Sequence, residues 1–385
     1  MGPESVFVSE SVTPGHPDKL CDLIADAVVE AVLRQDPMAA AEVECAVASG
    51  IVFLAARLAA RAAVDMPAIA REVAAEAGYA EPGPGGFDAR RCSILTSLTE
   101  LPEEERAEED PLADEHVNAF GFACDDTPEL MPMPILLAHR VARAFDAARA
   151  AGRLGALSPD AKVQVAVVYR DGRPLRIGAV TLICGGEEAA RAALPGLLRA
   201  EVLGPALAGA PLGLDSATVL AVNPGGVARG GGPATHPGLT GRKPGIDSYG
   251  EFSRQPQAAL SGKDPGRIDR LAAYAARWAA KNLVAAGLAA RCEVHLCYAP
   301  GRAEPASLRV HGYGTARLPE AELAERLLRA ADFRPGALLR RMDLRGRAAA
   351  APGGFLRALA VYGHVGRSDL DLPWEATELA AALRG

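Results

Sequence analysis

The stretch SESVTPGHPDK, residues 9–19, is the point at which an extended segment turns into a helix. Residues 4–12 alternate between polar and apolar side chains, which is typical of a strand with one buried face. The residues that follow, up to His16, form a turn, and Pro17 suits the first turn of a helix because its missing N–H needs no partner there. Apolar side chains then recur at helical spacing, so we expect a helix that ends near Gln35.

Strands and helices alternate through the rest of the chain. We expect further strands at 42–48, 50–56, 162–169, 174–184, 292–298 and 307–313. We expect further helices at 66–77, from about Pro134 onward, at 187–202, from Asp264-Pro265 to Gly287, and at 319–330. Residues 99–116 are acidic and poor in apolar side chains, residues 223–250 are rich in Gly and Pro, and the tail is Pro/Gly-rich, so these parts are expected to be irregular. The succession predicts an α+β or α/β fold in three comparable blocks.

Composition excludes several classes of protein. The 385 residues are 49% apolar and carry a net charge of −7, which supports a buried core and argues against a nucleic-acid coat. No apolar run reaches the ~18 residues that a membrane span needs, and the N-terminus lacks the pattern of a signal peptide. We therefore expect a cytoplasmic protein that binds neither nucleic acid nor a membrane.

The cysteines do not form a metal or disulfide motif. The seven are scattered and include no CxxC pair, which fits reduced thiols. Cys292 and Cys297 flank His295, but the stretch alternates like a strand, so the two thiols are expected on opposite faces. We interpret them as structural thiols rather than as a zinc site.

Lysine is scarce, and its positions point to a phosphate site. Arginine supplies all but five of the 41 basic residues, so each Lys is a candidate for work that needs a compact ammonium group. The candidates lie beside Gly, Pro or helix starts: His16, Asp18, Lys162, Arg242, Lys243, Lys263, Arg267 and Asp269. Each alone fits a solvated surface charge. Together, cations near helix N-termini and two carboxylates able to hold Mg²⁺ are what a polyphosphate needs.

At these residues the chain resembles the S-adenosylmethionine synthase (methionine adenosyltransferase) family. SESVTPGHPDK is similar to the opening motif of the family almost letter for letter. The other matching stretches are Thr127–Pro132, Gly238–Lys243, Ser261–Pro265, Lys281–Gly287 continuing to Tyr298, Tyr362–Arg367 and Pro373–Glu375. The resemblance extends over essentially the whole chain.

The resemblance implies a fold and a reaction. The fold is three similar α/β domains related by pseudo-threefold symmetry, here 1–102, 110–228 and 229–385. The assembly is a homodimer or a dimer of dimers whose active sites use both subunits. In the reaction, the sulfur of methionine attacks C5′ of ATP, and the triphosphate leaves and is hydrolysed to phosphate and pyrophosphate. A thioether has no proton to lose, so the work lies in stabilising the departing charge with cations and metal ions.

The resemblance also implies roles for individual residues. His16 would assist the leaving oxygen. Lys162, Arg242, Lys243 and Lys263 would hold the phosphates, with Arg267 where the family usually has Lys. Asp18 and Asp269 would each bind one of two Mg²⁺ ions, and Glu44 would stand at a K⁺ site.

The departures from the family pattern lie in the pockets for the organic groups. Arg57 stands where the family has a Glu that meets the amino group of the substrate, and His236 replaces an Asp. The loop 112–120 is shorter than usual and carries Glu115 and His116. The usual Arg-Phe beside adenine becomes Val227-Ala228, Leu101 replaces a Gln, and Pro300 replaces an Ile. The substrate-binding candidates are therefore Arg57, Glu115, His116, Ala228 and His236.

Three hypotheses follow. The first is an S-adenosylmethionine synthase that uses ATP and methionine. The second is a specialised paralogue that joins a related small nucleophile or a different triphosphate, because the rebuilt pockets change what is recognised. The third is a catalytically weak subunit that pairs with a true synthase, although retention of the phosphate-binding cations argues against a pure scaffold.

Overall fold

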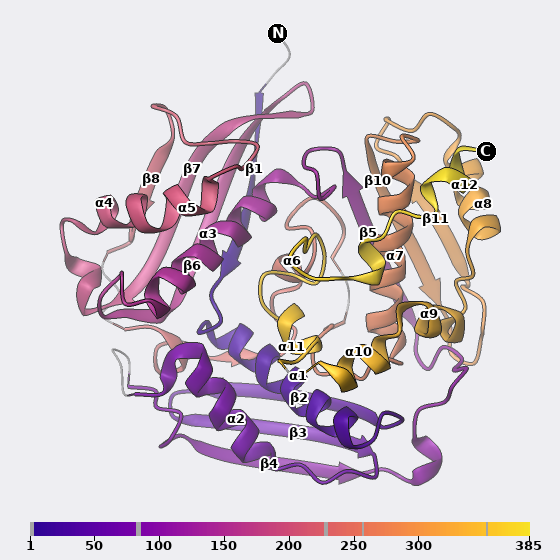
Figure 1. Ribbon diagram of the computed structural model, residues 1–385, viewed down its shortest axis with the longest axis horizontal. Helices are drawn as coiled ribbons and strands as arrows, with labels where there is room; N and C mark the ends of the chain where they lie inside the picture. The colour runs from indigo at the N-terminus through magenta and orange to yellow at the C-terminus, as the bar shows by residue number, and fades with distance from the viewer. Residues whose placement is uncertain (1–3, 82–85, 227–229, 256–257, 352) are drawn as a thin grey trace.

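The computed structural model describes residues 4–81, 86–226, 230–255, 258–351 and 353–385. Three sheets with covering helices surround the middle of the molecule (Figure 1). The first sheet has the order β1 (Glu4–Val12), β6 (Leu157–Arg170), β7 (Arg173–Gly186), β8 (Val219–Val222). The second has the order β4 (Ser93–Glu100), β3 (Ile51–Ala59), β2 (Ala40–Ala48), β9 (Gly238–Leu239). The third has the order β11 (Ser307–His311), β10 (Arg291–Tyr298), β5 (Val117–Cys124). The β3–β4 and β7–β8 pairs are parallel and the other pairs are antiparallel.

Each sheet is covered by one long helix. These helices are α1 (Pro17–Gln35), α3 (Met133–Ala150) and α7 (Ile268–Ala285). Helix α1 packs on β2 and β9, α3 packs on β6 and β1, and α7 packs on β10 and β5. Further helices are α2 (Met66–Ala74), α6 (Pro244–Asp247), α8 (Glu320–Ala330), α9 (Pro335–Met342), α10 (Leu344–Ala350), α11 (Leu356–Leu359) and α12 (Ala380–Arg384).

The three units exchange strands in a cyclic order. Strand β1 precedes α1 in the chain but pairs in the sheet under α3. Strand β5 precedes α3 but pairs in the sheet under α7. Strand β9 precedes α7 but pairs in the sheet under α1. Each unit is therefore tied to the next by a strand, and the contacts that complete each sheet are distant in sequence.

The start of α1 forms as predicted. His16 is the N-cap with extended φ/ψ of −65° and 131°, and its Nδ1 accepts the N–H of Asp18 at 3.2 Å. Pro17 occupies the first turn, and at the other end the N–H of Asp36 donates to the carbonyl of Val32. The helix is buried on nearly all sides, so its length is set by packing as well as by capping.

Some predicted elements differ from the structure. The single helix expected at 187–202 is a series of short pieces: a 3₁₀ turn (Glu187–Ala190), α4 (Leu194–Leu198), a π-helical turn (Arg199–Leu203) and α5 (Gly204–Leu207). Pro195 lacks an N–H and starts a new helix instead of continuing one. Helix α7 begins at Ile268, because Asp264 accepts the N–H groups of Ala41 and Gly266 and so holds the preceding loop.

Strands β4 and β5 were not predicted, and β4 extends into the acidic segment expected to be a loop. All residues of β4 except Ile94 are exposed, so that strand lacks the alternation of buried and exposed positions. Strand β5 is mostly buried on both faces and contains small residues of low strand propensity. The tail expected to be irregular contains α9 to α12, and Pro335 stands at the start of α9 rather than inside it.

The structure fits the sequence interpretation of the cysteines. All seven are free. Cys292 is buried in the core, whereas Cys297 lies on the other face of β10. Among the described residues, none of the helices has both the length and the apolar character required to cross a bilayer.

Helix α7 and strand β5 approach each other more closely than any side chain would allow. A Cβ on Gly121 would stand 1.9 Å from the backbone carbon of Ala276. The Ala-rich surface of α7 and the bare backbone of Gly121 therefore fit together, and the third sheet can pack flat against its helix.

We expect Gly121→Ala to lower the free energy of unfolding by about 3 kcal/mol, because the new methyl group pushes against a helix backbone that cannot give way. Gly50→Ala is the matched control: a Cβ on Gly50 meets nothing within 4 Å, so its effect should stay within about 0.5 kcal/mol. Urea denaturation of both variants and the wild type measures the difference, and equal stability of the two variants would contradict the packing argument.

Candidate functional site

Four buried carboxylates form a stripe along α1, at Asp18, Asp22, Asp26 and Glu30. Each is separated from the next by four residues and is at most 4% exposed. Residues four apart lie on one face of a helix, so the four side chains lie along one side of α1. We call this set the α1 acid stripe.

The α1 acid stripe holds the Gly-rich segment that carries the candidate cations. Oδ1 of Asp18 accepts the N–H of Leu239 at 3.1 Å, and Oδ1 of Asp22 accepts the N–H of Gly241 at 2.8 Å. Oδ1 of Asp26 accepts the N–H of Gly262 at 2.9 Å. Glu30 accepts the N–H of Leu356 in the same way. The first three bonds fix the backbone near Arg242, Lys243 and Lys263, and the fourth joins α1 to the start of α11.

Gly262 can take this place only because it has no side chain. Its φ is +81°, and a Cβ would stand 2.1 Å from the carbonyl oxygen of Val43. The neighbouring Lys263 pairs with Glu42 of β2 through an isolated bridge. The backbone of the SGKDP motif is therefore pressed between α1 and the edge of β2.

Two buried cations offset part of the negative charge of the stripe. Lys19 Nζ contacts Asp22 at 2.9 Å and also pairs with Asp247. Burial alone would lower the pKa of Lys19, but these two carboxylates outweigh it and raise the pKa. Arg270 of α7 donates to Oδ1 of Asp26 at 2.6 Å, and both side chains are fully buried. Helix α7 is thus joined to α1 by a buried charge-assisted hydrogen bond.

The first group of candidate residues gathers around His16 at the start of α1. Its ring lies 5.0 Å from the ring of His236, centroid to centroid. Arg242 stands 3.8 Å from Asp18, and Lys243 Nζ contacts Glu10 at 2.7 Å. We call the following set the His16 cluster: Glu10, His16, Asp18, Asp160, Lys162, His236, Arg242 and Lys243.

His16 is a neutral hydrogen-bond donor in this environment. Burial lowers its pKa to about 3, with the charges of Lys162, His236 and Lys243 acting in the same direction and that of Asp160 opposing them. Because Nδ1 accepts the N–H of Asp18, the proton of the neutral ring is on Nε2. Nε2 is buried and has no hydrogen-bond partner in the described structure.

The second group lies around Lys263, between β2 and the start of α7. Lys263 Nζ contacts Asp269 at 2.5 Å, and Arg267 contacts Asp114 at 2.7 Å. Arg267 also lies 3.7 Å from Glu115 and 3.9 Å from Glu42. We call the following set the Lys263 cluster: Glu42, Glu44, Asp114, Glu115, His116, Lys263, Arg267 and Asp269.

A cavity of about 260 Å³ opens beside the Lys263 cluster. Glu115, His116, Lys263 and Asp269 are among its lining residues. Glu44 lies next to this group, where burial raises its pKa, the charge of Lys263 lowers it and the charge of Glu42 raises it. The cavity thus combines an ammonium group, carboxylates and an imidazole in one hollow.

The two clusters are separate in one chain. Asp18 belongs to the first, and Asp26 holds the backbone beside the second. Eight residues of helix separate them, which is about 12 Å along α1. Within the described ranges, no hydrogen bond or ion pair joins the two clusters. The predicted phosphate-binding residues are therefore divided between two surfaces that share one helix.

The predicted residues of the organic pockets are also divided. Arg57 on β3 is exposed and stands 3.8 Å from Glu42, at the border of the Lys263 cluster. Glu115 and His116 line the cavity of that cluster, whereas His236 lies in the His16 cluster. Ala228 lies outside the described residues.

Several residues of the site were missed by sequence reasoning. They are Glu10, Asp22, Asp26, Glu42, Asp114 and Asp160. The signal for Asp22 and Asp26 was present, since acids at every fourth position of an otherwise apolar helix indicate a buried polar face. Asp160 stands two residues before Lys162, but nothing local indicates that it meets His236, 76 residues away.

Within the part of the chain that the structure describes, no helix covers the outer face of the second sheet. Ile51, Phe53, Leu95 and Leu239 are 43–54% exposed and lie on this face together with Glu42, Glu44 and Arg57. The register places Phe53 beside Leu95 and Ala46 beside Leu239. An apolar patch therefore continues directly into the Lys263 cluster.

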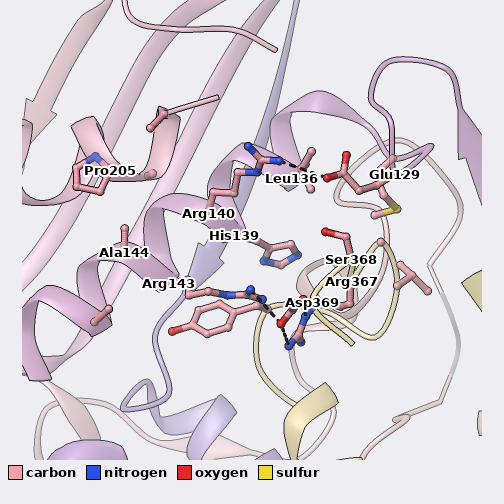
Figure 2. Close-up of a pocket in the computed structure, with 17 residues that line it drawn as sticks. Glu129, Leu136, His139, Arg140, Arg143, Ala144, Pro205, Arg367, Ser368 and Asp369 are labelled. Carbon is pink, nitrogen blue, oxygen red and sulfur yellow. Dashed lines mark hydrogen bonds and ion pairs between the residues drawn. The ribbon is translucent and has the colours of Figure 1, made fainter. Parts of the chain in front are cut away.

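A separate cavity of about 430 Å³ lies between α3, α5 and residues 362–369 (Figure 2). His139 points into it between Arg140 and Arg143. Arg143 is held at 3.1 Å from Asp369 and lies over the ring of Tyr362. None of the predicted site residues lines this cavity.

The arrangement of Asp18 and Asp269 fits Mg²⁺. Asp18 engages the N–H of Leu239 through Oδ1, and Asp269 engages Lys263 through Oδ2, so each can offer its other oxygen. Mg²⁺ is commonly held by one or two carboxylates together with waters and substrate phosphates, and does not need an all-protein cage. For K⁺, Glu44 and Glu42 lie on the same face of β2 and fit a weakly held monovalent cation.

Comparison with known proteins gives consistent matches over the whole chain. Three family models match: S-adenosylmethionine synthetase N-terminal domain at residues 4–102, central domain at 112–228 and C-terminal domain at 230–376. Proteins named S-adenosylmethionine synthase are similar over their full length. That of Synechococcus sp. (strain RCC307) is 43% identical, covering 99% of this chain and 99% of that protein. That of Parafrankia sp. (strain EAN1pec) is 41% identical, with 98% of each covered.

We expect His139 to make stability depend on pH. Burial, then the charges of Arg367, Arg143 and Lys19, lower its pKa to about 3, against an ordinary value of 6.5. Between these values the unfolded chain binds a proton that the folded chain does not, so stability falls as pH falls. From pH 6.5 to pH 5 the loss is about 2 kcal/mol.

The test compares wild type and His139→Gln by urea denaturation at pH 7 and pH 5. The variant starts less stable at pH 7, because it loses the bond between Ser11 Oγ and His139 Nδ1 at 2.9 Å. Its further loss at pH 5 should be about 2 kcal/mol smaller than that of the wild type. An equal loss in both would show that His139 titrates normally.

Proposed function

The chain belongs to the S-adenosylmethionine synthetase family, and from this premise we propose that it transfers the adenosyl group of ATP to the sulfur of methionine. The observation that carries the proposal is the pair of charged clusters that border the α1 acid stripe. Each contains Lys and Arg side chains, a carboxylate suited to Mg²⁺ and a histidine. The relatives are named for this reaction, so the specialised-paralogue alternative is not favoured.

The geometry suits a displacement at carbon. A lone pair of the methionine sulfur forms the new bond to C5′, and the C5′–O bond breaks with its electron pair going to the triphosphate. The sulfur becomes a sulfonium ion, and no proton is removed. Lys162, Arg242, Lys243, Lys263 and Arg267 stabilise the negative charge of the triphosphate. His16 donates its Nε2–H to the leaving oxygen.

Asp18 and Asp269 would each hold one Mg²⁺. When bound, these ions neutralise phosphate oxygens and so lower the cost of the leaving group's charge. The contact between Lys263 and Asp269 would then give way, with Lys263 free to hold the phosphates and Asp269 free to hold the Mg²⁺ ion. Glu44 would be a ligand of K⁺, with Glu42 beside it. After transfer, the same cations hold the triphosphate while it is hydrolysed to phosphate and pyrophosphate.

Recognition of the organic groups falls to residues that border the clusters. Glu115 and His116 line the cavity of the Lys263 cluster, and Arg57 stands at its edge. An arginine there would pair with the carboxylate of methionine, and Glu115 with its ammonium group. His236 completes the proposed contacts on the side of the His16 cluster. Ala228, outside the described residues, stays a substrate-binding candidate from the sequence alone.

We further propose that the active site is built by two copies of the chain. The uncovered face of the second sheet carries an apolar patch next to the Lys263 cluster. In a twofold dimer that buries this face, the His16 cluster of one copy can meet the Lys263 cluster of the other. This pairing brings together the phosphate-binding residues that one chain keeps apart. A dimer of dimers would repeat the same pair.

The cyclic exchange of β1, β5 and β9 supports a pseudo-threefold relation among three domains, which we propose to be 1–102, 110–228 and 229–385. Each long helix follows a strand that lies in the neighbouring sheet, in the same rotational sense. The free cysteines support a reducing, cytoplasmic location.

Complementation between inactive variants tests the shared site. Lys243→Ala removes a cation of the His16 cluster, and Lys263→Ala removes one of the Lys263 cluster. Each homodimer should lose about 100-fold in adenosylmethionine formation from ATP and methionine, read by mass spectrometry. A hybrid dimer isolated through two different tags contains one intact site and one doubly damaged site, so it should regain about half of the wild-type rate.

The matched control combines two lesions of the same cluster, Lys243→Ala with Arg242→Ala. Every site of that hybrid is damaged, so it should stay inactive. Recovery in the control, or none in the test hybrid, rules out a site shared between copies. Full activity of both single variants rules out the proposed function of the cations.

A further inference from the structure

One group of side chains in the His16 cluster has a set of ligand atoms that is also typical of a transition-metal site. Among the residues that the structure describes, His16, Asp160 and His236 are the single group of three histidine, cysteine or acidic side chains that can each offer a ligand atom within 4.8 Å of the others. They come from the start of α1, from β6 and from the turn after Gly232–Ala234.

The carboxylate at the centre of this group is held in place. Oδ2 of Asp160 accepts the N–H of Gly232 at 2.8 Å and lies 2.8 Å from Nε2 of His236. The ring of His236 in turn packs beside that of His16. Two of the three side chains are therefore oriented by bonds that do not depend on a ligand.

Two atoms of the group lack a partner. Nε2 of His16 and Oδ1 of Asp160 are both buried without a hydrogen bond. His16 is 2% exposed and Asp160 is 6% exposed, so water does not reach them freely. A buried polar atom is seldom left unpaired, and two such atoms in one small group point to a missing ligand.

We propose that His16, Asp160 and His236 bind a divalent first-row transition-metal ion such as Zn²⁺. Two imidazoles and one carboxylate with a further position open is a ligand set of catalytic zinc sites and of related iron sites. The site differs from the two proposed Mg²⁺ positions, because Mg²⁺ prefers oxygen ligands and a transition-metal ion favours imidazole.

Small adjustments complete the site. Tetrahedral zinc with bonds of about 2.1 Å needs ligand atoms about 3.4 Å apart, so ligand atoms within 4.8 Å of one another approach by at most about 1.4 Å. Nε2 of His16 becomes a ligand when the ring proton moves to Nδ1. Nδ1 then stops accepting the N–H of Asp18, so binding of the ion costs helix α1 this N-cap contact.

The surrounding charges favour an exchangeable ion over a permanent one. Lys162 and Lys243 lie near His16 and repel a cation. Glu10 offsets one of these charges through its contact with Lys243 at 2.7 Å. The ion is therefore attracted by its carboxylate ligand but repelled by nearby ammonium groups, so its binding is reversible.

The consequence for activity rests on the proposed function. An ion on Nε2 of His16 occupies the atom that would donate to the leaving oxygen. Binding of Zn²⁺ and formation of adenosylmethionine should exclude each other, so Zn²⁺ acts as a reversible inhibitor at this site.

Cobalt is the probe for binding. The full-length protein, treated with chelator and then saturated with Mg²⁺, is titrated with Co²⁺ and followed by visible d–d absorption. One Co²⁺ per chain should bind, and Zn²⁺ should displace it with loss of the absorption.

His236→Ala and His236→Asp should each weaken Co²⁺ binding at least 10-fold, with circular dichroism unchanged. A wild type without absorption, or unaltered binding in both variants, overturns the site.

His295→Ala is the matched control. Nε2 of His295 lies 3.1 Å from Sγ of Cys297, which makes this pair the obvious competitor for Co²⁺. The control variant should bind Co²⁺ as the wild type does, and loss of the absorption in it would assign the ion to the thiol instead.

Measuring the rate of adenosylmethionine formation distinguishes the proposed metal site from the proposed function. Zn²⁺ that displaces Co²⁺ without slowing adenosylmethionine formation overturns the inhibitory role of the ion. Absence of product with Mg²⁺ alone overturns the proposed function. The metal site is still tested in that case, because the cobalt absorption needs no turnover.

Discussion

The carboxylates of the α1 acid stripe are the constraint on which the rest of the structure depends. Burying a carboxylate without a partner is costly, so Asp18, Asp22 and Asp26 must find donors in the core. They find them in backbone N–H groups between Leu239 and Gly262, in Lys19 and in Arg270. One helix thereby holds the Gly-rich segment and the loop of the SGKDP motif beside the second sheet and is joined to α7 by Arg270, and these contacts position the candidate cations.

The cyclic exchange of strands explains how the three units hold fixed positions relative to one another around helix α1. Each sheet is completed by a strand from the neighbouring block, so no unit closes without the others. The His16 cluster sits where β1 and β6 meet the start of α1, and the Lys263 cluster sits where β2 meets α7. Both clusters therefore lie at junctions between units. A ligand held there contacts several elements at once, which suits the binding of a long, highly charged group.

Much of the local structure could be predicted from the sequence. The strand, turn and helix of residues 4–35 were correct because alternation, Pro17 and helical spacing agree over a long stretch. Strand β5 was missed because burial on both faces removes the alternation, and the prediction for 187–202 was wrong because Pro195 restarts the helix. The candidate cations were identified by type and context. Their division into two clusters was not, since it depends on contacts across more than 200 residues, such as that between Asp18 and Leu239.

The sequence by itself determined the order of elements, the resemblance to a family and the residues able to hold phosphate, because these follow from local spacing and residue chemistry. Only the tertiary structure decided that His236 meets Asp160 beside His16, that Asp26 anchors Gly262, and that the second sheet keeps an uncovered face. The physical reason is that a buried polar group is satisfied by whichever donor the fold brings near. Local patterns specify that a partner is needed, and packing across the chain selects which one it is.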